Sequence, residues 1–123
     1  MDARVADFVA EVAHDVVGLE VALFFQANPD TFDTSAGMAQ RLRHRHDEVQ
    51  PALERLAEPG VLEVCTRGDG KYHCYSLSRE AAVWHLLCMV SEAYLDQPEV
   101  RKQIVRLLVE RRRQQHAPAP GAP

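Results

Sequence analysis

The stretch TSAGMAQRLRHRHDEVQPALERLAEPGVLEVCTRGDGKYHCYSLS, residues 34–78, contains two helix patterns followed by two strand patterns. The first helix is expected to begin after an N-cap at Asp33 or Thr34. The second is expected to begin near Asp47, where Asp47 and Gln50 can form a capping box, and to end before Pro59-Gly60. The apolar residues of the two helices recur at helical spacing and are expected to face the core: Met38, Ala39, Leu42, Val49, Leu53 and Leu56. The pattern therefore predicts two short amphipathic helices joined by a tight turn.

The segments LEVCTR (62–67) and YHCYSL (72–77) alternate as strands do, and Asp69-Gly70 between them is typical of a hairpin turn. Their apolar faces match when Leu62 lies opposite Leu77, with Val64 opposite Tyr75. The same register places Cys65 directly opposite Cys74 on the other face, where both thiols are expected to be partly exposed.

Outward from this stretch, further helices are predicted on both sides. An amphipathic helix is expected over residues 3–16, weakened near Gly18, and a buried central helix over 19–27. After the hairpin, helices are expected over 79–95, capped by Ser78, and over 98–115, with Pro98 at the first position. The prediction is one domain over residues 1–116 with its core in 19–78. The tail 117–123 (APAPGAP) lacks core residues and is expected to be disordered.

The spacing from Ala39 to Val49, Leu53 and Leu56, followed by Gly60-Val61-Leu62, resembles the winged helix-turn-helix of bacterial MarR, ArsR and PadR regulators. The resemblance covers roughly residues 19–78. It implies a mainly α fold with a small two- to three-stranded antiparallel wing and flanking N- and C-terminal helices. It also implies that the second helix enters the major groove of DNA while the wing touches the backbone or minor groove.

Carried onto this chain, the resemblance implies a reading helix at about residues 47–58. Basic side chains near it would contact phosphates, and Gln50 and Arg55 would read bases. The candidate DNA-contacting residues are Arg41, Arg43, His44, Arg45, His46, Gln50, Arg55, Arg67 and Lys71. The outward residues Glu48, Glu54 and Glu58 depart from the pattern, because they would face phosphates. Two readings therefore stay open: a regulator that binds double-stranded DNA, and a winged-helix protein-interaction module.

The composition is that of an ordinary globular protein, with 46% hydrophobic and 26% charged residues and a net charge of −4. The acidic balance argues against a generally basic nucleic-acid binder, although residues 41–46 form a local basic cluster. No apolar run approaches the ~20 residues of a membrane span, and the acidic N-terminal residues are not expected to act as a signal peptide. The chain is expected to be cytoplasmic, with no membrane partner.

Cys65 and Cys74 are the candidate redox pair, since directly opposed strand residues are close enough for a disulfide. The alternative is two reduced, half-buried cysteines, as is usual in the cytosol. His73 is expected on the opposite face from the thiols, so no metal site is predicted there. No cofactor is predicted either. The chain has no recognisable catalytic motif and is not expected to be an enzyme.

The helix over 79–95 is apolar on two sides, which indicates burial on two sides. One side is expected to meet a second copy of the chain, with the last helix contributing; the alternative is a helix sandwiched within one subunit. The candidate interface residues of this homodimer are Trp84, His85, Cys88, Ile104 and Leu108.

Overall fold

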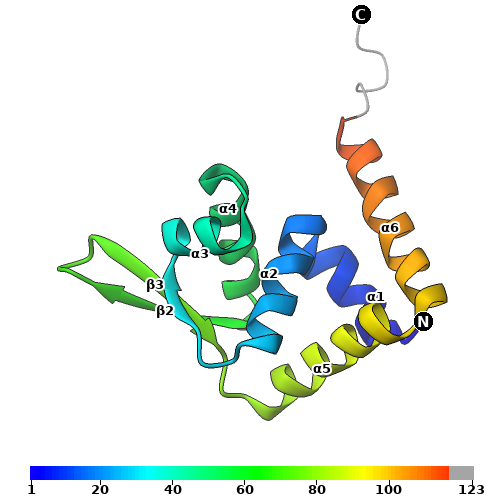
Figure 1. Cartoon of the computed structure of the whole chain (residues 1–123), viewed down its shortest axis with the longest axis horizontal. Coiled ribbons are helices and arrows are strands. Elements are labelled where there is room, and N and C mark those ends of the chain that lie inside the picture. Colours follow the sequence, from blue (N-terminus) through cyan, green and yellow to red (C-terminus); the bar gives the residue numbers. More distant parts are fainter. Residues whose placement is uncertain (117–123) are drawn as a thin grey trace, which may run out of the picture.

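The computed structural model describes residues 1–116 and forms a winged helix-turn-helix with flanking helices at both ends, which confirms the predicted fold class (Figure 1). In chain order the elements are α1 (Ala3–Asp7), η1 (Phe8–Ala13), α2 (Val16–Ala27), β1 (Phe32–Thr34), α3 (Ser35–Leu42), α4 (His46–Ala57), β2 (Leu62–Arg67), β3 (Tyr72–Leu77), α5 (Ala81–Asp96) and α6 (Pro98–His116). The tail 117–123, expected to be disordered, lies outside the described residues. Within residues 1–116, no helix is long and apolar enough to cross a membrane.

The prediction of one helix over residues 3–16 was wrong, because the chain breaks at His14. α1 passes at Phe8 into η1, a π-helical segment that ends at Ala13, and His14 then takes a left-handed conformation with a φ of 73°. The Asp15 carboxylate accepts a hydrogen bond from the Gly18 backbone N–H (2.7 Å) and so caps α2. A Cβ on Gly18 would lie 1.9 Å from the Ala13 carbonyl oxygen. Gly18 thus allows α2 to start directly against the end of η1.

The central helix α2 packs against η1, α4 and α5, as expected of a helix that is apolar nearly all round. It begins at Val16 rather than near residue 19, and Asn28 is its C-cap, where Asn28-Pro29 predicted an end. Its side chains join those of α4 and the N-terminal segment in one core, which includes the fully buried Val9, Phe25 and Leu53. This core holds the helix-turn-helix against the flanking helices.

The helix-turn-helix begins at an N-cap that the sequence predicts. Thr34 Oγ1 accepts a hydrogen bond from the Gly37 N–H (3.2 Å), and α3 ends where Arg43 takes a left-handed conformation. The predicted capping box of α4 does not form, because α4 starts one residue earlier, at His46. Asp47 consequently lies inside the first turn, where its carboxylate accepts hydrogen bonds from Arg45 (2.7 and 2.9 Å).

The wing has the predicted register: Leu62 pairs with Leu77, Val64 with Tyr75, and Cys65 with Cys74. Asp69 lies in the connecting turn with a positive φ of 56°, followed by Gly70 with a φ of 89°. A third strand, β1, pairs with the other edge of β3, so the strand order is β1-β3-β2. This third strand is only three residues long, and the sequence pattern did not predict its position.

The two C-terminal helices form an arm beside the core, with α5 along the base and α6 packed on η1 (Figure 1). Ser78 does not cap α5; its Oγ accepts from the Glu80 N–H (3.1 Å), and the helix begins at Ala81. Pro98 is the first residue of α6, as predicted. The inward face of α6 buries Ile104 and Leu108.

Candidate nucleic-acid interface

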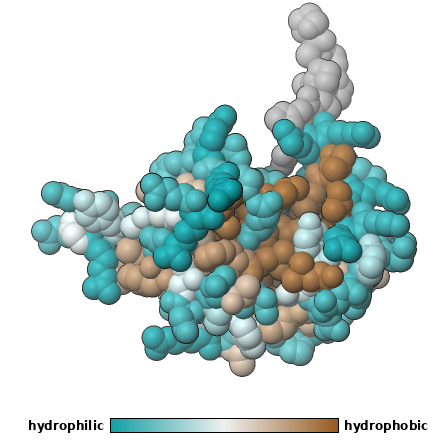
Figure 2. Space-filling view, in the orientation of Figure 1, coloured by the Kyte–Doolittle hydropathy of each residue, from teal (hydrophilic) through white to brown (hydrophobic). Residues whose placement is uncertain are grey.

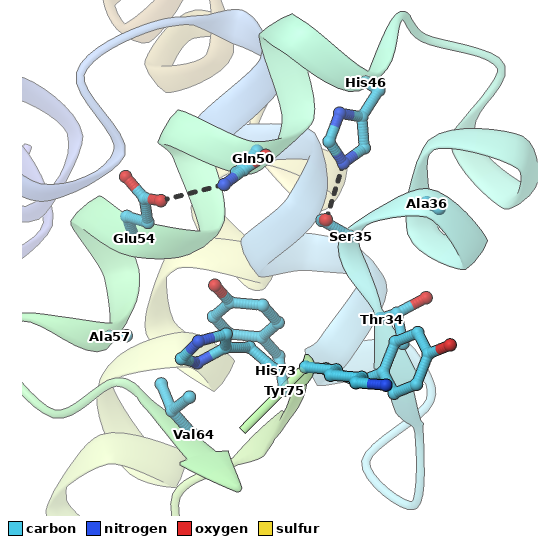
Figure 3. Close-up of a pocket in the computed structure, with 12 residues that line it drawn as sticks. Thr34, Ser35, Ala36, His46, Gln50, Glu54, Ala57, Val64, His73 and Tyr75 are labelled. Atoms are coloured by element: carbon cyan, nitrogen blue, oxygen red, sulfur yellow. Dashed lines mark hydrogen bonds between the residues drawn. The ribbon is translucent and has the colours of Figure 1, made fainter. Parts of the chain in front are cut away.

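A groove of about 670 Å³ separates α4 from the wing (Figure 3). It is lined by the start of α3, the outer side of α4 and one side of the hairpin. Its lining residues are Thr34, Ser35, Ala36, His46, Gln50, Glu54, Ala57, Val64, Lys71, Tyr72, His73 and Tyr75. The structure thus brings the predicted DNA-contacting residues His46, Gln50 and Lys71 to one groove.

Gln50 and Glu54 make the α4 wall of the groove polar and acidic. Gln50, the predicted base reader, is exposed and donates a hydrogen bond from Nε2 to Glu54 Oε1 (3.2 Å). Tyr75 lies below them, and burial, followed by the negative charge of Glu54, raises its pKa. Gln50 can therefore present its amide to a base edge only beside a carboxylate.

His46 and Ser35 close one side of the groove, with Nε2 and Oγ 2.7 Å apart (Figure 3). Lys71 lies on the wing side and is exposed. Arg67 is not among the lining residues; its guanidinium lies 5.5 Å from the centre of the Phe32 ring. The wing therefore brings Lys71 to the groove, while Arg67 stacks on β1.

The basic cluster between α3 and α4 is largely paired with acids. Arg41 donates to Asp33 (3.0 Å), and His44 contacts Glu20 and lies 3.7 Å from Glu48.

Arg45 donates to Asp47 and lies 3.5 Å from Glu48, and these carboxylates raise its pKa, with the hydrogen bond to Asp47 as the largest cause. The same hydrogen bond lowers the pKa of Asp47. Arg43 differs: its side chain is exposed and makes no hydrogen bond or ion pair within the described part of the chain. Arg43 thus presents an uncompensated positive charge at the turn.

Arg55, predicted to read bases, points away from the groove. Its Nη2 lies 3.0 Å from Asp15 Oδ2 and 3.5 Å from the Ala13 carbonyl oxygen, and its Nε is buried without a hydrogen-bond partner among residues 1–116. Since Gln50 and Glu54 are four apart, they share one side of α4, whereas Arg55 follows about 100° further round. The prediction of an outward Arg55 was therefore wrong; the side chain ties α4 to the junction of η1 and α2.

The two wing cysteines are paired as predicted but differ in exposure. Cys65 is half-buried, and Cys74 is only 9% exposed, so the expectation that both are partly exposed was wrong for Cys74. The reason is that β3 is the central strand, with β1 on its far side. Within residues 1–116, no three His, Cys, Asp or Glu side chains gather where they could hold a metal ion.

The candidate dimer residues divide into exposed and buried ones. Trp84 and His85 are exposed, and Cys88 is half-buried beside Gln26, with Sγ 3.8 Å from its Nε2. Ile104 and Leu108 are 0% and 4% exposed within the single chain, so their assignment to an interface was wrong.

The adjacent stripe of α6, Val105 and Val109, is exposed instead (40% and 43%). The pair Ile104 and Leu108 and the pair Val105 and Val109 both have helical spacing, so the sequence pattern does not show which pair packs in the core.

Comparison with solved structures supports the same fold. A chain named "Possible transcriptional regulator from Methanosarcina mazei Go1" aligns with a TM-score of 0.56, covering 80% of this chain and 86% of its own, at 16% sequence identity. Similarity at this identity shows the fold alone. No protein-family model and no curated protein sequence matches the chain.

Proposed function

We propose that the protein is a DNA-binding transcriptional regulator of the winged helix-turn-helix type, as its resemblance to MarR, ArsR and PadR regulators suggests. The observation that carries the proposal is the position of Arg43 and Lys71, two exposed lysine or arginine side chains without an ion pair in the described chain. They lie at the helix-turn-helix turn and at the wing, on either side of the exposed outer face of α4. In this arrangement α4 enters the major groove and the hairpin follows the adjacent backbone.

The contacts divide into phosphate and base contacts. Arg43 and Lys71 bind phosphates directly, and Arg45 joins them only by releasing Asp47. Gln50 is the base reader, because its amide matches the N6 and N7 edge of adenine. Arg55 takes no part, since Asp15 holds it on the other side of α4.

The acidic residues of α4 weaken this binding and make it selective. Glu54 lies in the groove next to Gln50, and Asp47 and Glu48 lie in the first turn of the helix. Glu54 faces the phosphates at a Coulombic cost, and Asp47 and Glu48 offset the charge of Arg45, so non-specific duplex binding is weak and requires low salt. Glu54→Gln removes one such charge and should strengthen binding to every duplex, whatever its sequence.

The second part of the proposal is a two-fold dimer, which would present two α4 helices to a palindromic site. Figure 2 supports it: hydrophilic residues cover the wing tip and α3, whereas a hydrophobic area lies between α4 and α6. Exposed Val105 and Val109 on α6, and Trp84 on α5, are further apolar surface for a partner copy. Light scattering should give the dimer mass, and Val109→Glu should reduce it to the monomer.

The test is fluorescence anisotropy with labelled duplexes, starting with the DNA upstream of the coding gene. Arg43→Ala should weaken binding, whereas Arg4→Ala should not. Arg4 is the control for net charge: it is also an exposed arginine, but it is paired with Asp2 and lies in α1, far from the wing (Figure 1). Equal loss in both variants would show only a general charge effect and contradict the assigned interface.

A winged-helix protein-interaction module is the second candidate, favoured by one observation. The exposed side of α4 carries Asp47 and Glu54, and Glu58 follows at its C-cap, so this surface suits a basic protein partner. On this reading the chain binds no duplex even at low salt, and Glu54→Gln weakens partner binding. Because Glu54→Gln strengthens duplex binding in the first proposal, the same variant separates the two functions.

A further inference from the structure

The wing holds two cysteines on facing strands, in a geometry that permits a covalent link. Cys65 of β2 and Cys74 of β3 are directly opposed in the antiparallel register. Opposed residues of this kind have Cα atoms about 4.5–5.5 Å apart. That separation falls within the range that a disulfide spans. The register therefore places the two residues at a separation that a disulfide can span.

A second observation concerns what covers the pair. Side chains alternate between sheet faces, so Cys65, Cys74, Arg67 and Phe32 share one face. Arg67 is opposite Tyr72 and Phe32 is opposite Ser76, and Cys74 lies midway between these two positions on β3. The Arg67–Phe32 contact consequently spans the sheet above Cys74, which explains why this thiol is only 9% exposed on an outer face.

Cys65, by contrast, opens onto a hollow. A depression of about 620 Å³ on this side of the sheet is lined by Cys65 together with residues of β1, β3 and the start of α5, among them Phe32, Ser76 and Trp84. Cys65 is half-buried and lines this hollow, so a small solute in the hollow lies beside it. The pair thus consists of one accessible thiol and one sheltered thiol directly beside it.

We infer that Cys65 and Cys74 form a dithiol–disulfide site that is oxidised by small hydroperoxides, with Cys65 reacting first and Cys74 resolving. In the first step the Cys65 sulfur attacks the peroxide O–O bond and becomes a sulfenic acid, and one water leaves with the thiol proton. In the second step the Cys74 sulfur displaces the sulfenic hydroxyl, which leaves as water with the Cys74 proton. One hydrogen peroxide is thereby reduced to two waters, and the two thiols become one disulfide.

Oxidation joins the edge strand β2 to the central strand β3 and so fixes the hairpin that carries Lys71. Thr34, the N-cap of α3, lies opposite Cys74 on its other side. A bridge at Cys74 therefore stiffens the sheet directly beside the start of the helix-turn-helix. A small dithiol reductant reverses the reaction by exchange.

The test is intact-mass and peptide analysis of the full chain at low protein concentration, after hydrogen peroxide treatment and alkylation of the remaining thiols. Wild type and Cys88→Ser should each lose the mass of two hydrogens and yield a peptide cross-linked between positions 65 and 74. Cys88 is the matched control because it is the third cysteine, also half-buried, but on α5.

Cys74→Ser should stop at the sulfenic acid on Cys65, and Cys65→Ser should form no bridge.

An unbridged wild type, a bridge that involves Cys88, or oxidation of Cys65 directly to the sulfinic acid would overturn the inference. Circular dichroism checks that each serine variant is folded. Since the readout is mass, the outcome does not depend on whether the chain binds DNA.

Discussion

The side chains of Arg55 and Gln50 project from different sides of α4. Replacing Arg55 with alanine should therefore affect stability, and replacing Gln50 with alanine should affect duplex affinity. Arg55→Ala removes an ion pair to Asp15 whose side chains are 28% and 45% exposed. Half-exposed pairs of this kind contribute about 0.5–1 kcal/mol. The weak hydrogen bond to Ala13 and the packing of the arginine stem add to the loss, whereas deletion of the unpartnered Nε offsets part of it. We expect a loss of about 1 kcal/mol in the free energy of unfolding, with duplex affinity unchanged.

Gln50→Ala should leave stability nearly unchanged and weaken duplex binding. Gln50 is exposed and bonds only to Glu54, so its loss should change stability by no more than about 0.5 kcal/mol. The loss of a bidentate base contact should weaken specific binding by about 1–3 kcal/mol.

Urea unfolding followed by circular dichroism measures the first quantity, and duplex anisotropy under folded conditions measures the second. Asp15→Asn sharpens the test, since asparagine can still cap α2 but cannot form the ion pair.

In a double-mutant cycle, Asp15→Asn and Arg55→Ala should couple by about 0.5–1 kcal/mol. Loss of duplex affinity in Arg55→Ala at unchanged stability would show that Arg55 faces DNA and contradict its assignment to the junction of η1 and α2.

Three further predictions concern stability. Arg111 Nε donates a hydrogen bond to His14 Nδ1 (2.9 Å). Burial, followed by the charges of Arg111 and Arg55, lowers the pKa of His14 below its ordinary 6.5. The unfolded state therefore binds this proton at a higher pH than the folded state, and the free energy of unfolding should fall as the pH drops below about 6.5. Urea midpoints across pH should show this fall in wild type and a smaller one in His14→Asn, which suits the left-handed conformation. Thr34→Ala should lower stability by about 1 kcal/mol in urea, and Thr34→Ser should restore most of it. Ile104→Ala should cost about 2–5 kcal/mol, whereas Val105→Ala, on the exposed stripe, should cost under about 1 kcal/mol; equal costs would contradict the orientation of α6.

The helix-turn-helix and the wing register were predictable because both rest on local patterns. Matching the apolar residues of the two strands selects the register that places Leu62 opposite Leu77, although Val64, expected to face inward, is 46% exposed. The N-cap at Thr34 follows from chemistry within four residues, so it was predictable for the same reason.

The features that the sequence did not reveal depend on contacts between distant segments. The break at His14 reflects the close approach of Gly18 to Ala13, and the orientation of Arg55 reflects Asp15, forty positions earlier in the chain. β1 is too short to show alternation and exists because β3 offers it an edge. Contacts between distant segments can be seen only in the folded structure. The contact with Asp15 removes Arg55 from the candidate DNA-contacting residues.

The most direct test of the central claim is duplex binding of the wild-type chain as a function of salt, beside Arg43→Ala and Lys71→Ala. The account predicts binding at ~50 mM salt that weakens steeply as salt rises, and a slope of log affinity against log salt that falls by about 1 in each variant. Absence of binding to any genomic duplex at that salt, or binding that neither variant alters, would contradict it.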